Sequence, residues 1–184
     1  MSKFLSTTAA AAVLAASAIV GSSAPATSAE FNFRMHTFIP PVANPAKTFL
    51  APWAKKINKA SGGRINVKPF WAMQLGGKPT QLLDQVRDGV VDMAWIVNAY
   101  AAGSFPRTEV FELPGVHQGD SGAVNQAMQA MYKDELSKDF KGMVALFQHV
   151  HGGQAIHMAD TVVRSPADMA GKKMRIPSRT GSWV

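Results

Sequence analysis

Cysteine is absent from the 184-residue sequence, and this absence removes several classes of protein from consideration. No disulfide can stabilise the chain, no thiol can act as a nucleophile, and no cysteine can carry a lipid anchor. Long apolar runs are missing as well, because the uncharged stretch 9–20 is shorter than the ~20 residues that a membrane-spanning helix needs. Stability must therefore come from a hydrophobic core.

Acidic residues are scarce: 12 Asp and Glu stand against 19 Lys and Arg, and the formal net charge is +7. A basic surface is typical of proteins that bind nucleic acid, anionic membranes or anionic solutes. The basic residues are scattered along the chain, so we interpret their charge mainly as solvated surface with a bias towards anionic ligands.

The first 29 residues have the layout of a cleavable signal peptide. Lys3 provides a positive charge, residues 9–20 form the apolar segment, and Thr27-Ser28-Ala29 supplies small residues before Glu30. A low-complexity tail rich in alanine and serine is the alternative interpretation. We expect cleavage after Ala29, which leaves a periplasmic protein with no inserted membrane segment and no nucleic acid as a partner.

The next part of the chain alternates between strand and helix patterns. Apolar and polar residues alternate over 31–36 and 64–70, and 90–97 is mostly apolar, as in a strand covered on both faces. Helical spacing covers 44–60 and 80–88. This order predicts a βαβαβ unit with parallel strands.

Two prolines shape the expected first helix. Asn44 and Pro45 form a helix start, whereas Pro52 lies inside the helical pattern and predicts a kink or a restart there. Gly62-Gly63 is expected to end the helix.

Further along, the pattern becomes less regular. Residues 99–120 are rich in loop-forming residues, 123–140 has helical spacing, and Ser165-Pro166-Ala167-Asp168 predicts a helical turn. We expect strands at 143–150, 154–158 and 173–176. No covering helix follows the last of these, so we expect the chain to be part of a longer protein.

Five segments carry a family resemblance. They are GGRINV at 62–67, MQLGG at 73–77, LDQVRDGVVDMA at 83–94, FELP at 111–114 and DMAGKKMRIP at 168–177. In this order they resemble the solute-binding proteins of TRAP transporters, the tripartite ATP-independent periplasmic (DctP-like) family. The resemblance extends over about residues 31–180.

The resemblance implies an α/β, two-lobed architecture like that of periplasmic binding proteins, with parallel or mixed sheets. Residues 30–150 would form lobe I, and residues 151–184 would begin an incomplete lobe II. It implies a monomer that is not an enzyme and needs no cofactor, and that captures a small carboxylate-containing organic solute for an ion-gradient-driven TRAP permease. A ligand-sensing periplasmic subunit and an exported enzyme on the same fold are the alternatives.

Arg175 is the strongest candidate for a ligand contact. Within the segment 168–177, the resemblance implies that this arginine binds the carboxylate of the ligand. Its planar guanidinium can donate two parallel hydrogen bonds to a carboxylate and stays charged at any relevant pH. An exposed arginine at a strand end is the alternative.

Six further residues are candidates by their positions in the pattern. His36 and Thr37 follow the first strand, Lys78 follows the Leu-Gly-Gly turn, and Asn98 follows the third strand, where open α/β sheets present ligand contacts. Gln154 occupies a position at which sialic-acid-binding members carry an arginine, so the resemblance argues against sialic acid here. Ser178 matches a polar position near the ligand carboxylate. Capping, solvated or structural roles are the alternatives for these residues.

Other signals are weaker. His149, His151 and His157 lack a carboxylate or cysteine partner in the pattern, so we expect no metal site. Residues 76–80 superficially resemble a P-loop but lack its first glycine and its Ser or Thr. Phe38, Trp71 and Trp95 could line an apolar wall or belong to the core.

Overall fold

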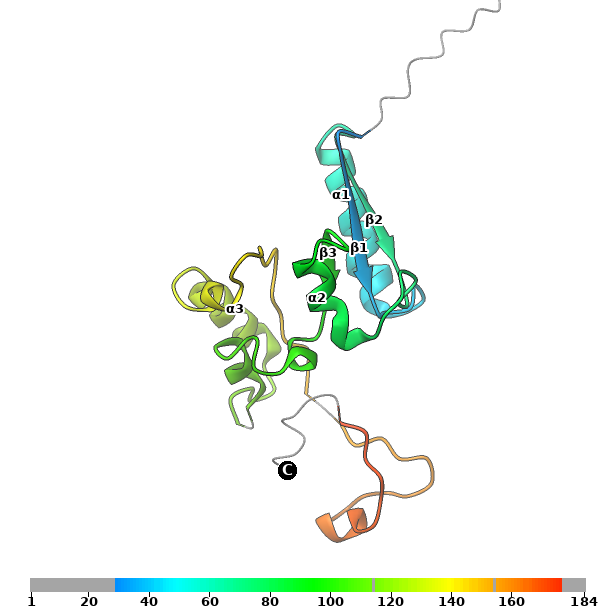
Figure 1. The fold of residues 1–184 in the computed structure, drawn as a ribbon. Helices are drawn as coiled ribbons and strands as arrows, with labels where there is room; N and C mark the ends of the chain where they lie inside the picture. Colours follow the sequence, from blue (N-terminus) through cyan, green and yellow to red (C-terminus); the bar gives the residue numbers. More distant parts are fainter. Residues whose placement is uncertain (1–28, 114, 154, 177–184) are drawn as a thin grey trace, which may run out of the picture.

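The computed structural model describes residues 29–113, 115–153 and 155–176. Its centre is a three-stranded parallel sheet in the order β2-β1-β3, formed by β1 (Phe31–Thr37), β2 (Ile65–Phe70) and β3 (Met93–Trp95). Figure 1 shows the sheet beside helix α1. The predicted α/β class with parallel strands is confirmed.

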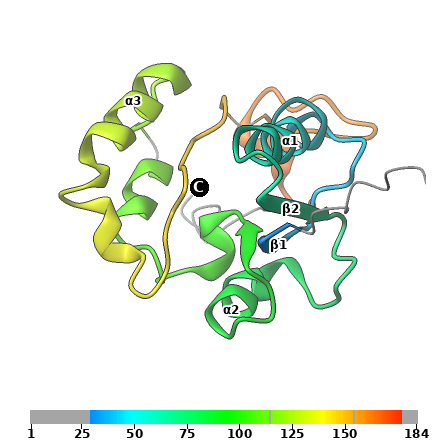
Figure 2. The same ribbon diagram turned by 90° about the horizontal axis from the view of Figure 1, so that it is seen from above.

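Two helices make the crossovers between the strands. Helix α1 (Ala51–Ala60) connects β1 to β2, and helix α2 (Leu82–Arg87) connects β2 to β3. Figure 2 shows that α1 and α2 lie on opposite faces of the sheet. The predicted βαβαβ order is therefore present, and the central strand β1 has a partner on each side.

The first crossover begins irregularly. A π-helical turn, Ala46–Leu50, precedes α1, and Pro52 lies in the first turn of α1. Proline has no N–H to donate to the preceding turn, so the hydrogen-bond ladder restarts here, as Pro52 predicts. The helix ends at Ala60 and is followed by Gly62 and Gly63, whose φ angles of 63° and 83° suit glycine.

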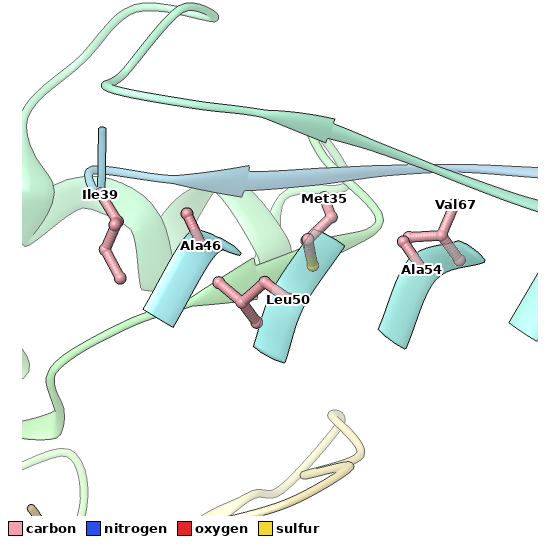
Figure 3. Close-up of a cluster of buried hydrophobic side chains, with 6 residues drawn as sticks. All are labelled: Met35, Ile39, Ala46, Leu50, Ala54 and Val67. Carbon is pink, nitrogen blue, oxygen red and sulfur yellow. The ribbon is translucent and has the colours of Figure 1, made fainter. Parts of the chain in front are cut away.

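The hydrophobic core lies between this crossover and one face of the sheet (Figure 3). Met35 and Val67 face this core from neighbouring strands. Val67 pairs with Phe33, and Met35, two residues further along β1, lies on the same face of the sheet as Phe33. Leu50, which is 1% exposed, fills the centre of the helical side. The whole cluster consists of Met35, Ile39, Ala46, Leu50, Ala54 and Val67.

The third strand is shorter than predicted. The strand expected over 90–97 covers only Met93–Trp95, and Val90 is 49% exposed. Gly89, with a φ of 70°, ends α2, and residues 90–92 form bends rather than ladder pairs. The expectation of a long strand covered on both faces was therefore wrong, because the turn after α2 takes up its first residues.

Asp92 fixes the start of this strand. Its carboxylate accepts hydrogen bonds from the backbone N–H of Arg34 at 2.7 Å and from the Arg34 Nε at 3.3 Å. The backbone N–H of Arg34, together with the guanidinium, lowers the pKa of Asp92 below its ordinary value of 3.8. This contact ties β3 to β1.

The lowered pKa of Asp92 predicts a pH-dependent stability. The Asp92 contact stabilises the fold fully above the ordinary pKa and loses this contribution as the pH falls through the lowered folded-state pKa. Asp92→Asn should therefore lower the Tm at neutral pH, and the difference from wild type should shrink from about pH 5 to about pH 2. Thermal unfolding followed by circular dichroism tests this, and a difference that stays constant over the range would contradict it.

The remaining described elements are mostly short. They are the helix α3 (Ser121–Tyr132) and the 3₁₀ turns Pro79–Gln81, Asn98–Ala101, Thr108–Glu112, Leu136–Asp139 and Pro166–Met169. The predicted turn at 165–168 is confirmed, and Asp168 caps it by accepting from the backbone N–H of Ser165. Along the described residues, no helix is long and apolar enough to cross a membrane.

The helix predicted over 123–140 ends early. Asp120 caps the start of α3 by accepting from the Ala123 N–H, but the α-helix stops at Tyr132 and Leu136–Asp139 forms a separate 3₁₀ turn. Met131, near the end of α3, is 44% exposed. Tertiary contacts of Asp139, described below, outweigh the local helical preference.

The strands expected at 143–150, 154–158 and 173–176 were wrong, since the described residues of these segments join no strand ladder. The segment 143–150 is instead hydrogen-bonded to helix α3 through Asn125. The Asn125 amide donates to the Val150 carbonyl at 3.3 Å and accepts from the Val150 N–H at 2.6 Å. Both views show the segment passing between α3 and the sheet (Figures 1 and 2).

Candidate functional site

The sheet has a topological switch point at the carboxyl ends of β1 and β3. These strands are neighbours, but the chain leaves β1 towards α1 on one face of the sheet and reaches β3 from α2 on the other face. Open α/β sheets bind ligands in this position, because the diverging connections leave room outside the strand ends. Thr37 ends β1, Trp95 ends β3, and Asn98 begins the following 3₁₀ turn.

Aromatic side chains gather at this point. Phe38 lies 5.8 Å from Trp95 and 5.6 Å from Tyr100 between ring centroids. The imidazole of His149 stacks on Trp95 at 5.8 Å and 27°. We call these four rings, Phe38, Trp95, Tyr100 and His149, the aromatic array. Phe38, Trp95 and Tyr100 are half-buried, and His149 is exposed.

Arg175 reaches one end of the array. Its Nη2 donates to the hydroxyl of Tyr100 at 3.3 Å, across 75 positions of sequence. In the described part of the chain, no carboxylate lies within ion-pair distance of this guanidinium. The array therefore ends in a positive charge that no described acid neutralises.

Tyr100 was not among the residues predicted from the sequence. It lies in the turn Asn98–Ala101 that directly follows β3, two residues beyond the candidate Asn98. A scan of every polar side chain in the first turn after a strand end would have included it. Its contact with Arg175 has no sequence signal, because the two segments meet only in the fold.

His36 and Thr37 are the last two residues of β1, and both are fully buried. The Nδ1 of His36 lies 2.7 Å from Gln85 Oε1, and its Nε2 accepts from the Leu75 N–H at 3.3 Å. The Thr37 hydroxyl accepts from the Ile39 N–H at 3.2 Å. These polar atoms already have hydrogen-bond partners within the protein. The two side chains therefore stabilise the end of β1, and their contact with a ligand stays a prediction.

The connection after β2 forms a neighbouring edge of the site. Ala72 and Met73 have positive φ angles of 49° and 60°, which are uncommon for residues with a side chain. Their N–H groups donate to the carbonyls of Ile39 at 3.0 Å and Thr37 at 3.1 Å. The structure thus holds an unfavourable backbone conformation at the strand ends, a feature that often accompanies function.

Two further predicted residues, Lys78 and Asn98, lie in the described part of the chain. Lys78 is exposed, and its backbone N–H donates to Gln81 Oε1 at 2.8 Å. Asn98 is half-buried at the start of its turn. Gln154 and Ser178 lie outside the described residues, so their roles stay predictions, as does the role of Arg175 itself.

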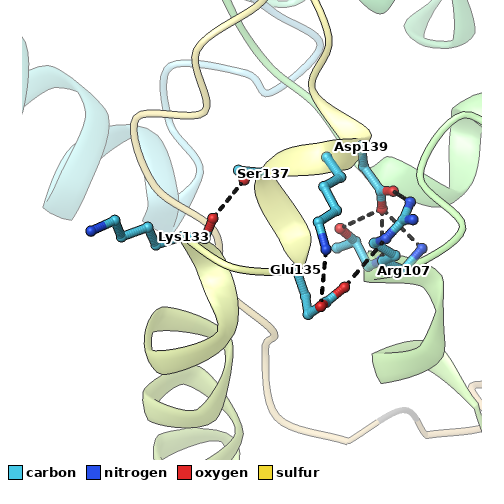
Figure 4. A network of polar contacts seen from close by, with 7 residues as sticks. Arg107, Lys133, Glu135, Ser137 and Asp139 are labelled. Atoms are coloured by element: carbon cyan, nitrogen blue, oxygen red, sulfur yellow. Dashed lines mark hydrogen bonds and ion pairs between the residues drawn. The ribbon is translucent and has the colours of Figure 1, made fainter.

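A separate polar network joins the turns after β3 to the turn after α3 (Figure 4). The Asp139 carboxylate is buried and accepts from the Arg107 N–H, the Arg107 guanidinium, the Thr108 N–H and the Thr108 hydroxyl. Glu135 pairs with Lys138 at 3.0 Å and with Arg107 at 3.7 Å. The pKa of Glu135 is lowered, first by its hydrogen bond to Lys138.

A hollow of about 460 Å³ lies beside this network, lined by Arg87, Arg107, Lys138, Lys141 and Asp139 among others. The carboxylate of Asp139 already accepts hydrogen bonds from four donors. One exposed acid, Glu135, pairs with two of the lining cations, Arg107 and Lys138. We therefore locate the candidate site at the aromatic array, where the strand ends, the rings and an unneutralised arginine coincide. Among the residues described, no three His, Asp or Glu side chains gather as a metal site would require.

Comparison with known proteins finds solute-binding proteins of TRAP transporters among the solved structures. A TRAP solute-binding protein from an unidentified marine microbe, specific for aromatic acid ligands and crystallised with 3-hydroxybenzoate, is 43% identical with a TM-score of 0.76. The match covers 83% of this chain and 47% of that one. A TRAP solute-binding protein from Rhodoferax ferrireducens T118, solved with copurified benzoate, is 43% identical with a TM-score of 0.69, covering 80% and 46%.

A curated relative, the uncharacterized protein YiiZ of Salmonella typhimurium, is 24% identical over 139 residues, which are 73% of this chain and 41% of the relative. The chain thus spans less than half the length of each of these relatives. The family model of the bacterial extracellular solute-binding proteins, family 7 (DctP), matches residues 37–182. The chain therefore belongs to the DctP family of bacterial extracellular solute-binding proteins.

Proposed function

We propose that the protein captures a small aromatic carboxylate in the periplasm and presents it, chemically unchanged, to a TRAP permease in the membrane. The observation that carries this proposal is the contact between Arg175 and Tyr100. It joins a guanidinium with no described acidic partner to a group of aromatic rings. A ligand that combines a carboxylate with an aromatic ring complements both parts.

The guanidinium and the aromatic rings each have a binding preference that supports this ligand class. A guanidinium forms charge-assisted, bidentate hydrogen bonds with a carboxylate. Phe38 and Trp95 offer ring faces and edges to an aromatic ligand, and such pairs add about 0.5–1.5 kcal/mol beyond the burial of apolar surface. The aromatic acids bound by the two solved relatives, both 43% identical, support the same class.

A calorimetric series tests the proposal by separating ring from charge. We expect the full-length protein to bind benzoate, to bind cyclohexanecarboxylate about tenfold more weakly because the ring–ring contacts are lost, and to bind benzamide hardly at all because the charge is lost. Tighter binding of aliphatic acids such as succinate would exclude the aromatic class. Absence of binding to every carboxylate in the series would refute capture of an organic acid.

A further inference from the structure

We propose that His149 is the specificity-determining residue for a hydroxyl group on the ring of the ligand. This inference rests on the proposed function and adds the substituent that the site selects. The protein would then prefer hydroxylated aromatic acids over the unsubstituted acids.

The first step is the way in which His149 is held. Its imidazole stacks on Trp95 at 27° and on Phe147 at 24°, with centroid distances of 5.8 and 6.2 Å. Phe147 itself packs edge-on against Phe49 at 4.8 Å. Ring contacts therefore position the imidazole, and its two nitrogens lie on the edge of the stack.

The second step is that these nitrogens are available. A neutral imidazole carries one hydrogen-bond donor and one acceptor. Within the described residues, neither nitrogen of His149 makes a hydrogen bond, whereas both nitrogens of the buried His36 are bonded and Nδ1 of His151 contacts the Gly152 carbonyl. His149 is thus a polar group of the aromatic array whose nitrogens no described residue uses as a hydrogen-bond partner.

The third step is its position relative to Arg175. The contacts run in order from Arg175 to Tyr100, Phe38, Trp95 and His149. A ligand whose carboxylate meets Arg175 and whose ring lies against Trp95 would present the far edge of that ring to the imidazole that stacks on Trp95. A hydroxyl in the meta or para position points that way, but an ortho hydroxyl lies beside the carboxylate.

The energetic consequence is selectivity. A site that supplies a hydrogen-bond partner favours the hydroxylated ligand, because that ligand's hydroxyl would otherwise lose its water without replacement. One such hydrogen bond corresponds to about tenfold in affinity. We therefore expect 3- or 4-hydroxybenzoate to bind about tenfold more tightly than benzoate, and 2-hydroxybenzoate to show no such gain.

The test is a cycle that removes each partner in turn. His149→Phe keeps an aromatic ring for the stack and removes the nitrogens. Calorimetry should give a benzoate-to-hydroxybenzoate Kd ratio of about ten for the wild type and about one for H149F. H157F serves as the matched control, since His157 is an exposed histidine of the same region outside the array, and its ratio should equal that of the wild type.

Two outcomes would overturn the inference while leaving the proposed function intact. One is a wild-type protein that binds benzoate and its hydroxylated forms equally well. The other is an H149F protein that keeps the wild-type ratio. If H149F does not fold, ¹⁵N NMR of the wild-type protein replaces the variant. The signals of the His149 ring nitrogens should shift when 3- or 4-hydroxybenzoate binds and should not shift when benzoate binds. Equal shifts with both ligands would also refute the inference.

Discussion

Replacing Arg175 by alanine is expected to weaken the binding of an aromatic carboxylate at least about a hundredfold. Each charge-assisted hydrogen bond from a guanidinium contributes about 1.5–3 kcal/mol, and 1.4 kcal/mol corresponds to a factor of ten. Two such bonds to one carboxylate would therefore account for the loss. Within the described residues no other cation contacts the aromatic array, so none of them can replace Arg175. Isothermal calorimetry on the full-length protein measures the effect.

Arg175→Lys separates charge from geometry at the same position. Lysine keeps the positive charge but not the planar pair of donors, so we expect an intermediate loss of about tenfold or more. Arg164→Ala is the matched control, since this arginine contributes only its backbone N–H to the contact with Asp168. Wild-type affinity in R175A, or an equal loss in R164A, would show that the carboxylate binds elsewhere.

Replacing Asp139 by alanine is expected to lower the free energy of unfolding by about 3 kcal/mol. The side chain of Asp139 is fully buried and accepts from four donors on Arg107 and Thr108 at 2.9–3.2 Å. Its removal leaves two backbone N–H groups and a hydroxyl without an acceptor, and buried donors without a partner are costly. The half-exposed Arg107 can turn towards water, which limits the loss. Chemical denaturation measures the change.

Two companion variants identify the cause of this loss. Asp139→Asn keeps the shape and one acceptor oxygen but loses the charge, so its effect should be about half that of D139A. Glu135→Ala removes an exposed carboxylate that pairs with the same Arg107, and it should leave the stability nearly unchanged because exposed ion pairs are screened by solvent. An effect of E135A as large as that of D139A would locate the stability in surface charge instead of the buried carboxylate.

The central sheet could be predicted from the sequence because its signals are local. Alternation marked β1 and β2, and Pro52 marked the restart of the first helix. The shortened β3 could not be predicted, since the apolar run over 90–97 does not reveal that the turn after α2 takes up residues 90–92. The early end of α3 could not be predicted either, because Asp139 bonds residues more than 30 positions away.

The candidate site was predictable only in part. The segment 168–177 indicated Arg175 as a candidate, and the structure brings this residue to Tyr100. The position after a strand end indicated Asn98, which lies two residues before Tyr100. The contact between Arg175 and Tyr100, and the stacking of His149 on Trp95, join segments separated by more than 50 positions. No periodicity encodes such pairs. The position of His36 at a strand end suggested a ligand contact. In the fold, its two ring nitrogens contact Gln85 and Leu75, respectively, which the sequence pattern did not indicate.

The connection Trp71–Gly77 has a consequence for the thermodynamics of binding. Its backbone is fastened to the carbonyls of Thr37 and Ile39, to the imidazole of His36 and, through Gly76, to Gln85. The entropy lost in ordering this edge is therefore lost when the chain folds, not when a solute arrives. If the protein binds a solute here as proposed, the solute would meet an edge that is already ordered, and less of the interaction energy would be consumed in ordering it.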